Sequence, residues 1–200
     1  MDQSNQVTWS YYNKLEHEND TIKLVGFMDA GSIITKSKVE YANLLELKFS
    51  LLVYPDAYQE SAVVDIDFWD GSKNFISGVI MGDKISFIIK ENYRVKHLFT
   101  VNHKYEWIDI YILLNFKDLL ISINNVDIEY KFKSIPGLCT VAFGNNVKPL
   151  IFGEHNRASF GIKNIYLKTG YNDQFPLIID NLHKLDSFEF RDHSAKKVRR

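Results

Sequence analysis

A short acidic segment that contains a tryptophan is the part of this sequence best suited to chemistry. It reads DIDFWDG at positions 65–71. In an extended strand alternate side chains point to opposite faces, so Asp65, Asp67 and Trp69 share one face. A tryptophan ring can stack on a sugar, and flanking carboxylates can accept hydrogen bonds from its hydroxyl groups. We therefore predict ligand binding by Trp69, Asp65 and Asp67. The competing interpretation is a second buried face on which Trp69 packs under a loop.

The same carboxylates admit two other interpretations, catalysis and metal binding. A retaining glycosidase needs carboxyl groups about 5–5.5 Å apart. Asp65 and Asp67 would lie about 6.6 Å apart along a strand, and Asp70 would face the other way. Calcium takes about six to eight oxygen ligands, so Asp65, Asp67 and Asp70 alone would be an incomplete site. We predict no catalytic residues, and we keep calcium bound by these acids as an alternative.

A polar loop supplies a second group of candidate residues. Positions 152–157 read FGEHNR and combine an acid, a histidine and an arginine. Loops at the ends of a β-sandwich often carry binding residues, so we predict that His155 and Arg157 contribute to ligand binding. The alternative is an ordinary solvated loop.

Composition and charge exclude several classes of function. The chain has 24 basic and 25 acidic residues, so it lacks the positive field that attracts nucleic acid. No apolar run approaches the roughly 18 residues of a membrane span. Cys139 is the only cysteine, which excludes intramolecular disulfides and multi-cysteine zinc sites. Its apolar neighbours at positions 138–143 predict an inert thiol in the core.

Alternation of apolar and polar residues recurs along the chain and predicts strands. Five apolar residues share one face of positions 43–54, and shorter stripes cover 85–89, 108–114 and 126–132. Further strands are expected at 21–27, 62–69, 75–80, 119–123, 138–143 and 160–168. About ten strands with little helix must bury their faces against one another, which predicts an all-β, two-sheet antiparallel sandwich.

The domain organisation follows from where these strands fall. We expect an N-terminal arm at 1–20, one sandwich domain at 21–180 and a charged tail at 181–200. Positions 1–6 lack the basic and apolar segments of a signal peptide. The protein is then either cytoplasmic or a domain of a larger secreted or surface chain. We expect the second, an extracellular or cell-surface location.

Several segments resemble the laminin G-like jelly rolls of the concanavalin A-like lectin/glucanase superfamily. Positions 106–112 and 119–125 read EWIDIYI and LLISINN, a hairpin pattern in which Trp107 opens one strand and an Asn-Asn turn ends the other. Positions 141–146, 160–167 and 173–177 resemble the closing strands of such domains in Bacteroidetes-type surface proteins. The resemblance implies a jelly-roll fold in which Trp107 caps the core.

The resemblance also bears on function. Glycosidases of this superfamily carry an E-x-D-x-x-E motif, which this sequence matches in spacing, with Asp65 and Asp70 in place of the catalytic glutamates. Legume-type lectins bind calcium through E-x-D-x-F/Y-x-N, and Gly71 stands where that motif has its asparagine. The sequence therefore predicts a non-catalytic binding module for a glycan or a protein. A glycoside hydrolase that uses Asp65, Asp67 and Asp70 and a purely structural spacer domain are the alternatives.

Overall fold

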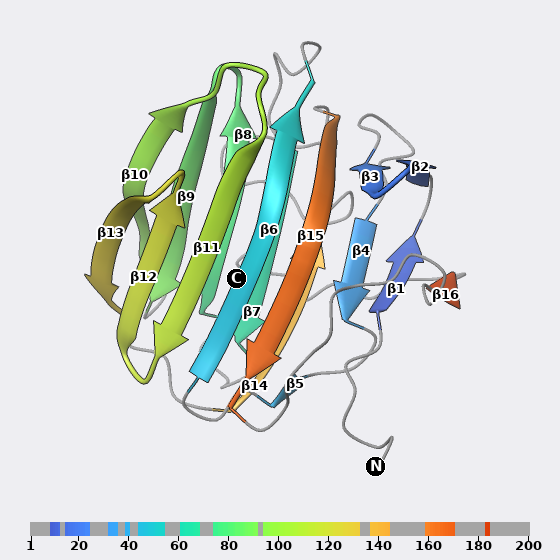
Figure 1. Ribbon diagram of the computed structural model, residues 1–200. Helices are drawn as coiled ribbons and strands as arrows, with labels where there is room; N and C mark the ends of the chain where they lie inside the picture. Colours follow the sequence, from blue (N-terminus) through green and yellow to red (C-terminus); the bar gives the residue numbers. More distant parts are fainter. Residues whose placement is uncertain are drawn as a thin grey trace, which may run out of the picture.

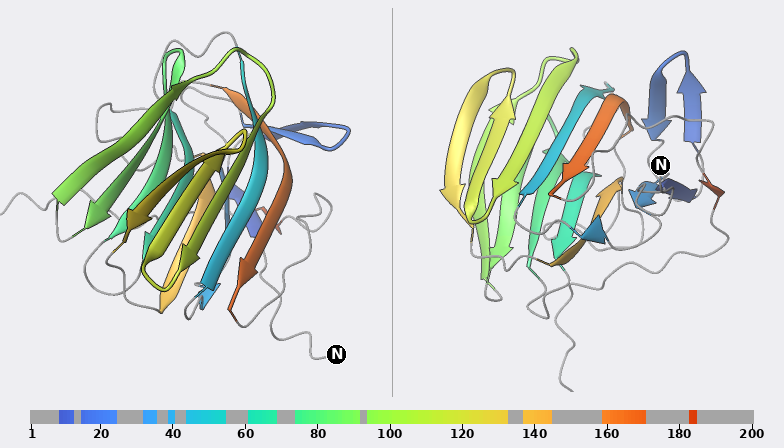
Figure 2. Two further views of the ribbon diagram at one scale, coloured as in Figure 1. Left: turned by 60° about the vertical axis from the view of Figure 1, so that its left-hand side comes forward. Right: turned by 60° about the horizontal axis from the view of Figure 1, so that its bottom comes forward.

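Two stacked β-sheets form the described part of the chain (Figures 1 and 2). The computed structural model describes residues 9–12, 15–24, 32–35, 39–40, 44–54, 61–68, 74–91, 94–132, 137–144, 159–170 and 183–184. Sixteen strands and no helix lie in these ranges, so no described segment is a helix that could span a membrane. The predicted fold class, an all-β two-sheet sandwich, is confirmed.

One sheet has seven strands and is antiparallel throughout. Its strands, in spatial order, are β13 (Val126–Lys131), β12 (Asp118–Ile123), β11 (Ile108–Asn115), β6 (Leu44–Val53), β15 (Phe160–Thr169), β3 (Thr21–Leu24) and β2 (Leu15–Glu18). Strands β2 and β3 form a hairpin that extends away from the body of the sandwich (Figure 2).

The other sheet has nine strands and packs behind the first in Figure 1. Its path is β10 (Arg94–Asn102), β9 (Lys84–Glu91), β8 (Phe75–Met81), β7 (Ser61–Phe68), β14 (Leu138–Phe143), β4 (Ser32–Thr35), β1 (Trp9–Tyr12) and β16 (His183–Lys184), and β5 (Val39–Glu40) also pairs with β14. The β1–β16 pair is parallel, and the others are antiparallel.

The core lies between the two sheets and is built from the predicted apolar stripes. The five apolar residues on one face of β6 are at most 2% exposed. Aromatic pairs join the layers: the ring centres of Phe49 on β6 and Phe143 on β14 lie 5.0 Å apart, edge to face. The ring centres of Phe68 on β7 and Phe132, the residue after β13, lie 5.2 Å apart. Because aromatic rings at these separations attract each other beyond their area of burial, these pairs help to hold the sheets together.

A hydrogen-bonded chain ties the two sheets together at one side of the sandwich. Lys96 on the edge strand β10 donates to Tyr130 Oη on the edge strand β13 over 2.8 Å. The Tyr130 hydroxyl in turn donates to Glu91 Oε2 on β9 over 2.8 Å. Glu91 is 3% exposed, and a buried carboxylate needs such partners. These hydrogen bonds therefore also give the buried Glu91 carboxylate a partner, and without one its burial would lower the stability of the fold.

All ten predicted strands are present, and the other described strands were missed. Strand β10 carries charged residues on exposed positions, and its register shifts between His97 and Phe99, which interrupts the alternation. Strands β1 and β2 lie in the segment expected to be an arm, and β16 lies in the expected tail. These strands have two to four residues each, too few to show a period.

Cys139 is expected to resist alkylation in the folded protein. It lies on β14 with no exposed surface, which confirms the predicted core position, and burial raises the pKa of its thiol well above the ordinary value. Since the thiolate is the nucleophile, iodoacetamide at pH 8 should leave Cys139 unmodified in native protein and modify it fully in concentrated urea. Intact-protein mass spectrometry measures both states, and rapid modification of the native protein would contradict this account.

Candidate functional site

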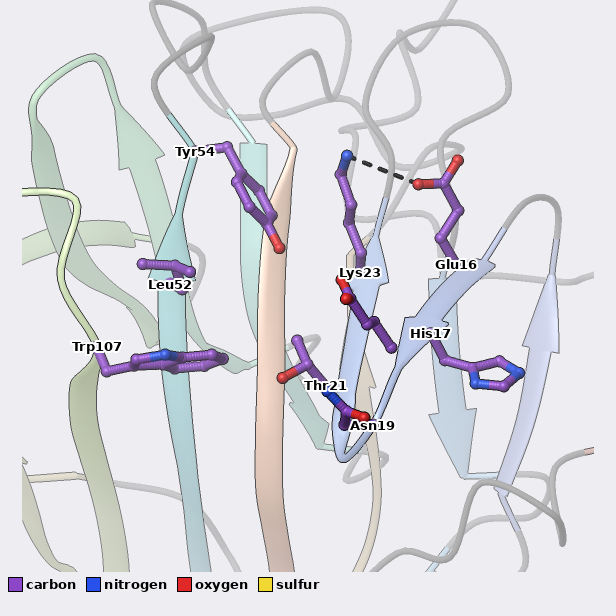
Figure 3. Close-up of a pocket in the computed structure, with 9 residues that line it drawn as sticks. Glu16, His17, Asn19, Thr21, Lys23, Leu52, Tyr54 and Trp107 are labelled. Atoms are coloured by element: carbon purple, nitrogen blue, oxygen red, sulfur yellow. Dashed lines mark ion pairs between the residues drawn. The ribbon is translucent and has the colours of Figure 1, made fainter.

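An open hollow of about 700 Å³ lies on the outer face of the seven-stranded sheet, beside the β2–β3 hairpin (Figure 3). This volume is within the usual range for small-ligand sites. The lining residues come from the hairpin, the end of β6 and the segment before β11: Glu16, His17, Glu18, Asn19, Thr21, Lys23, Leu52, Tyr54 and Trp107. The hollow therefore collects side chains from segments that are far apart in the sequence.

Gly161 on β15 lies beneath side chains that line the hollow. In the sheet register it stands between Leu52 on β6 and Lys23 on β3. A Cβ atom at position 161 would lie 3.1 Å from both Thr21 Cγ2 and Tyr54 Oη, and 3.7 Å from Trp107 Cη2. Three lining side chains thus close over Gly161, which is itself buried. Glycine at this position lets them approach the sheet closely.

One wall of the hollow is aromatic. Trp107, directly before β11, is 36% exposed, and Tyr54, directly after β6, is half-buried. Figure 3 shows the indole of Trp107 edge-on, below Leu52 and Tyr54. The expectation that Trp107 caps the core is wrong: Ile108 is buried in the core, so Trp107 falls on the opposite face of the strand.

The opposite wall is polar and belongs to the β2–β3 hairpin. Glu16 and Lys23 are cross-strand partners, and their charged groups form an ion pair of 3.6 Å (Figure 3). Lys23 Nζ also lies 4.9 Å from the centre of the Tyr54 ring. An exposed ion pair stabilises the fold by less than about 1 kcal/mol, so exchanging it for ligand contacts carries little penalty. This wall offers a ligand both hydrogen-bond donors and acceptors.

A β-bulge places a lysine beside the aromatic wall. The register between β15 and β6 shifts between Lys163 and Tyr166, and Asn164 has a positive φ of 54°. Ile162 and Ile165 are both buried, so the two residues between them face outward. Lys163 Nζ lies 4.2 Å from the centre of the Trp107 ring. Bulges commonly redirect side chains beside functional sites, and this one turns Lys163 onto Trp107.

Hydrogen bonds beneath the hollow hold the bulge in place. Asn164 Nδ2 donates to Ser50 Oγ over 3.3 Å, and Ser50 Oγ donates to Asp109 Oδ1 over 2.7 Å. The backbone N–H of Asp109 donates to Asn124 Oδ1 over 2.9 Å. These contacts link β15, β6 and β11 with the β12–β13 turn. They therefore hold Asn164, the residue next to Lys163 in the bulge, against the neighbouring strand.

A row of residues farther along the same face lies outside the hollow. Lys48 Nζ lies 5.1 Å and 5.6 Å from the ring centres of Tyr111 and Tyr166, and 2.8 Å from Glu46 Oε1. The hydrogen bond with Glu46 raises the pKa of Lys48, and burial raises the pKa of Tyr111. Lys48 stays an ammonium and Tyr111 a neutral phenol at physiological pH, so neither is suited to proton transfer there.

Asp65 and Asp67 occupy the opposite outer face of the sandwich, on β7. They point away from the core stripe, as predicted, but they are only 3% and 6% exposed. The same face of the nine-stranded sheet holds a buried apolar cluster of Phe75, Val79 and Ile88. Asp65 and Asp67 are therefore not exposed to a ligand, and this face of β7 is a second buried face, which agrees with the competing interpretation. Alternation shows which face a side chain takes, whereas burial depends on what covers that face.

The other predicted site residues, Trp69, Asp70, His155 and Arg157, lie outside the described residues. Their roles in binding ligand or calcium stay predictions. Within the described residues, no group of three or more His, Cys, Asp and Glu side chains is arranged to hold a metal ion.

The comparisons with known proteins show the fold. The sequence matches no protein-family model and no curated protein. Similar solved structures include the botulinum neurotoxin DC binding domain in complex with rat synaptotagmin II, with TM-score 0.59 and 13% identity over 82% of this chain and 43% of that one. Another is the botulinum neurotoxin serotype C1 binding domain, with TM-score 0.59 and 16% identity over 80% of this chain and 43% of that one.

A third similar structure is the serotype D ligand-binding domain in complex with N-acetylneuraminic acid, with TM-score 0.59 and 12% identity over 89% of this chain and 45% of that one. The chain thus spans less than half the length of each of these proteins. Identity at this level shows a shared sandwich fold. The finer laminin G-like and Bacteroidetes-type resemblance stays a prediction.

Proposed function

We propose that this chain is a non-catalytic carbohydrate-binding module whose sugar binds in the hollow above Gly161. The observation that carries the proposal is the convergence of Trp107, Tyr54 and Thr21 over Gly161, with a polar wall opposite. An aromatic ring packs against the C–H face of a sugar, while ammonium, carboxylate and hydroxyl groups bind its hydroxyls. Both kinds of contact are available within one hollow of about 700 Å³.

The arrangement of carboxylates favours binding over hydrolysis. A glycosidase places two carboxyl groups on either side of the scissile bond. The carboxylates that line this hollow, Glu16 and Glu18, share one face of β2, and Glu16 is paired with Lys23. Both acids would approach a bound sugar from the same wall. The hollow is therefore arranged to hold a sugar in place.

The similar solved structures support a binding role at the level of the fold. They include neurotoxin binding domains in complex with N-acetylneuraminic acid and with synaptotagmin, and the matched sandwich makes up less than half of each of those chains. The small, polar-walled hollow favours a sugar for this chain. An extracellular or cell-surface location within a larger protein goes with the proposal, because glycans are displayed there.

Replacing Trp107 with alanine is expected to weaken glycan binding by about tenfold or more, because the sugar loses its stacking surface. A glycan and polysaccharide panel, with and without calcium, first identifies the tightest ligand of the wild-type protein. Isothermal titration calorimetry then measures the dissociation constants of wild type and Trp107→Ala.

Two control variants locate the effect. Phe116→Ala removes an exposed aromatic ring, 60% exposed, at the other end of β11, and should leave the affinity unchanged. Trp69→Ala tests the site predicted from the sequence and should also leave it unchanged. Full affinity in Trp107→Ala, or no binding by the wild-type protein to any glycan, would refute the proposal.

A further inference from the structure

We propose that Lys163 is a positioning residue, whose ammonium group holds the indole of Trp107 in the orientation that a bound sugar needs. This inference rests on the proposed function and adds a residue that does not itself line the hollow. Its basis is the contact between Lys163 Nζ and the Trp107 ring, 4.2 Å from the ring centre. Lys163 therefore acts on the ligand only through Trp107.

The side chain of Lys163 reaches across a strand to meet this ring. The sheet register sets Lys163 on β15 opposite Ser50 on β6, and Ser50 opposite Asp109 on β11, two residues after Trp107. Neighbouring strands lie only about 4.8 Å apart, so a side chain as long as lysine can extend over the strand between them. The short side chain of Ser50 leaves room for the lysine stem. The contact is therefore a consequence of how these three strands pair.

The charge of Lys163 is directed to the ring and not to a carboxylate. Among the described residues Lys163 forms no ion pair, whereas Lys23 and Lys48 are paired with glutamates at 3.6 Å and 2.8 Å. Its distance to the ring centre is also shorter than the 4.9 Å between Lys23 and Tyr54. The negative face of an aromatic ring attracts a cation, and tryptophan does so most strongly. The contact therefore restrains the indole of Trp107.

The contact also determines which face of the indole is left for a ligand. Figure 3 shows Leu52 and Tyr54 on one side of the edge-on ring. Lys163 approaches from the other side, because it stands opposite Ser50, two residues before Leu52 on β6. One face of Trp107 is thus backed by the ammonium group, and the other is turned toward the hollow. A ring that is already held in this way loses little conformational entropy when a sugar binds.

The order of the Trp107 indole in the free protein is the first readout. The heteronuclear ¹⁵N–¹H NOE of its indole N–H group reports motion on the picosecond to nanosecond timescale. Lys163→Met keeps an aliphatic side chain and removes the charge, so we expect a lower NOE for Trp107. Lys163→Arg keeps a cation that stacks on aromatic faces and should retain the wild-type value. Lys48→Met removes a cation from the same outer face, beside Tyr111, and should leave the Trp107 value unchanged.

Glycan affinity is the second readout. Calorimetry uses the tightest neutral glycan of the panel, so that no ion pair between the ligand and Lys163 contributes. Loss of the contact between the cation and the ring should weaken binding by Lys163→Met about twofold to fivefold. Lys163→Arg and Lys48→Met should bind with the wild-type affinity. Urea denaturation of the three variants controls for changes in stability.

The contrary outcomes separate this inference from the proposed function. An unchanged Trp107 NOE in Lys163→Met, or a loss that also occurs in Lys163→Arg, would overturn the positioning role. A lower NOE with undiminished affinity would overturn it as well. Absence of glycan binding by the wild-type protein would refute the proposed function and the role of Lys163 in binding, whereas the ordering of Trp107 by Lys163 would still stand or fall on the NOE of the free protein.

Discussion

A leucine at position 161 is expected to abolish glycan binding while the sandwich stays folded. Its Cβ would lie 3.1 Å from Thr21 Cγ2 and Tyr54 Oη, so the larger side chain would push these two lining side chains into the hollow. Because the hollow is then distorted and partly filled, calorimetry should detect no binding at ligand concentrations that saturate the wild-type protein.

A graded series controls for damage to the fold. Gly161→Ala adds only the Cβ, and we expect an affinity between that of wild type and that of Gly161→Leu. The close contacts are to side chains on the outer face, so both variants should unfold cooperatively in urea with a modest loss of stability. Undiminished binding by a folded Gly161→Leu would place the ligand somewhere other than this hollow.

Replacing Phe143 with alanine is expected to lower the free energy of unfolding by about 3–5 kcal/mol. Phe143 has no exposed surface, and its ring meets Phe49 of the other sheet with centres 5.0 Å apart and planes at 78°. The substitution removes this contact between the sheets and leaves a cavity that the flanking strands cannot close without moving. Urea denaturation followed by fluorescence measures the change.

The matched controls separate packing from other effects. Phe143→Leu keeps most of the volume and should cost clearly less than Phe143→Ala. Tyr111→Ala removes a ring from the outer face and should also cost less, because that ring is only half-buried. Similar losses for all three variants would contradict a core held together by rings between the sheets.

The strands with one regular apolar stripe could be predicted from the sequence. On β6, alternation alone identified the five core residues, because each outward neighbour is polar or only half-buried. Strand β10 could not be found in this way. Its charged exposed positions and the shift between His97 and Phe99 remove the period on which the prediction depends.

The candidate site could be predicted only in part. Alternation placed Asp65 and Asp67 on the correct face of β7, but their burial depends on coverage from other parts of the fold, which local sequence does not show. The resemblance assigns Trp107 to the core, whereas the phase of the Ile108 stripe places it on the opposite face of the strand. The structure agrees with the phase, since Ile108 is buried and Trp107 is 36% exposed.

The remaining features of the hollow depend on strand pairing. Gly161 lies beneath the hollow only because β15 lies between β6 and β3, which brings Leu52 and Lys23 to its sides. A glycine in the outward phase of a strand, as in the FGI of positions 160–162, was the available signal. The bulge at Lys163 left a weaker trace, two successive polar residues between the apolar Ile162 and Ile165.

The most direct test of the central claim is a titration of ¹⁵N-labelled protein with its tightest glycan, followed through the tryptophan indole N–H signals. The chain has three tryptophans, and Trp→Phe variants assign the signals of Trp9, Trp69 and Trp107. Binding above Gly161 predicts that the Trp107 signal shifts with the ligand while the Trp69 signal stays in place. A shift of Trp69 with Trp107 unmoved would contradict this account and locate the ligand near Trp69, as the sequence predicts.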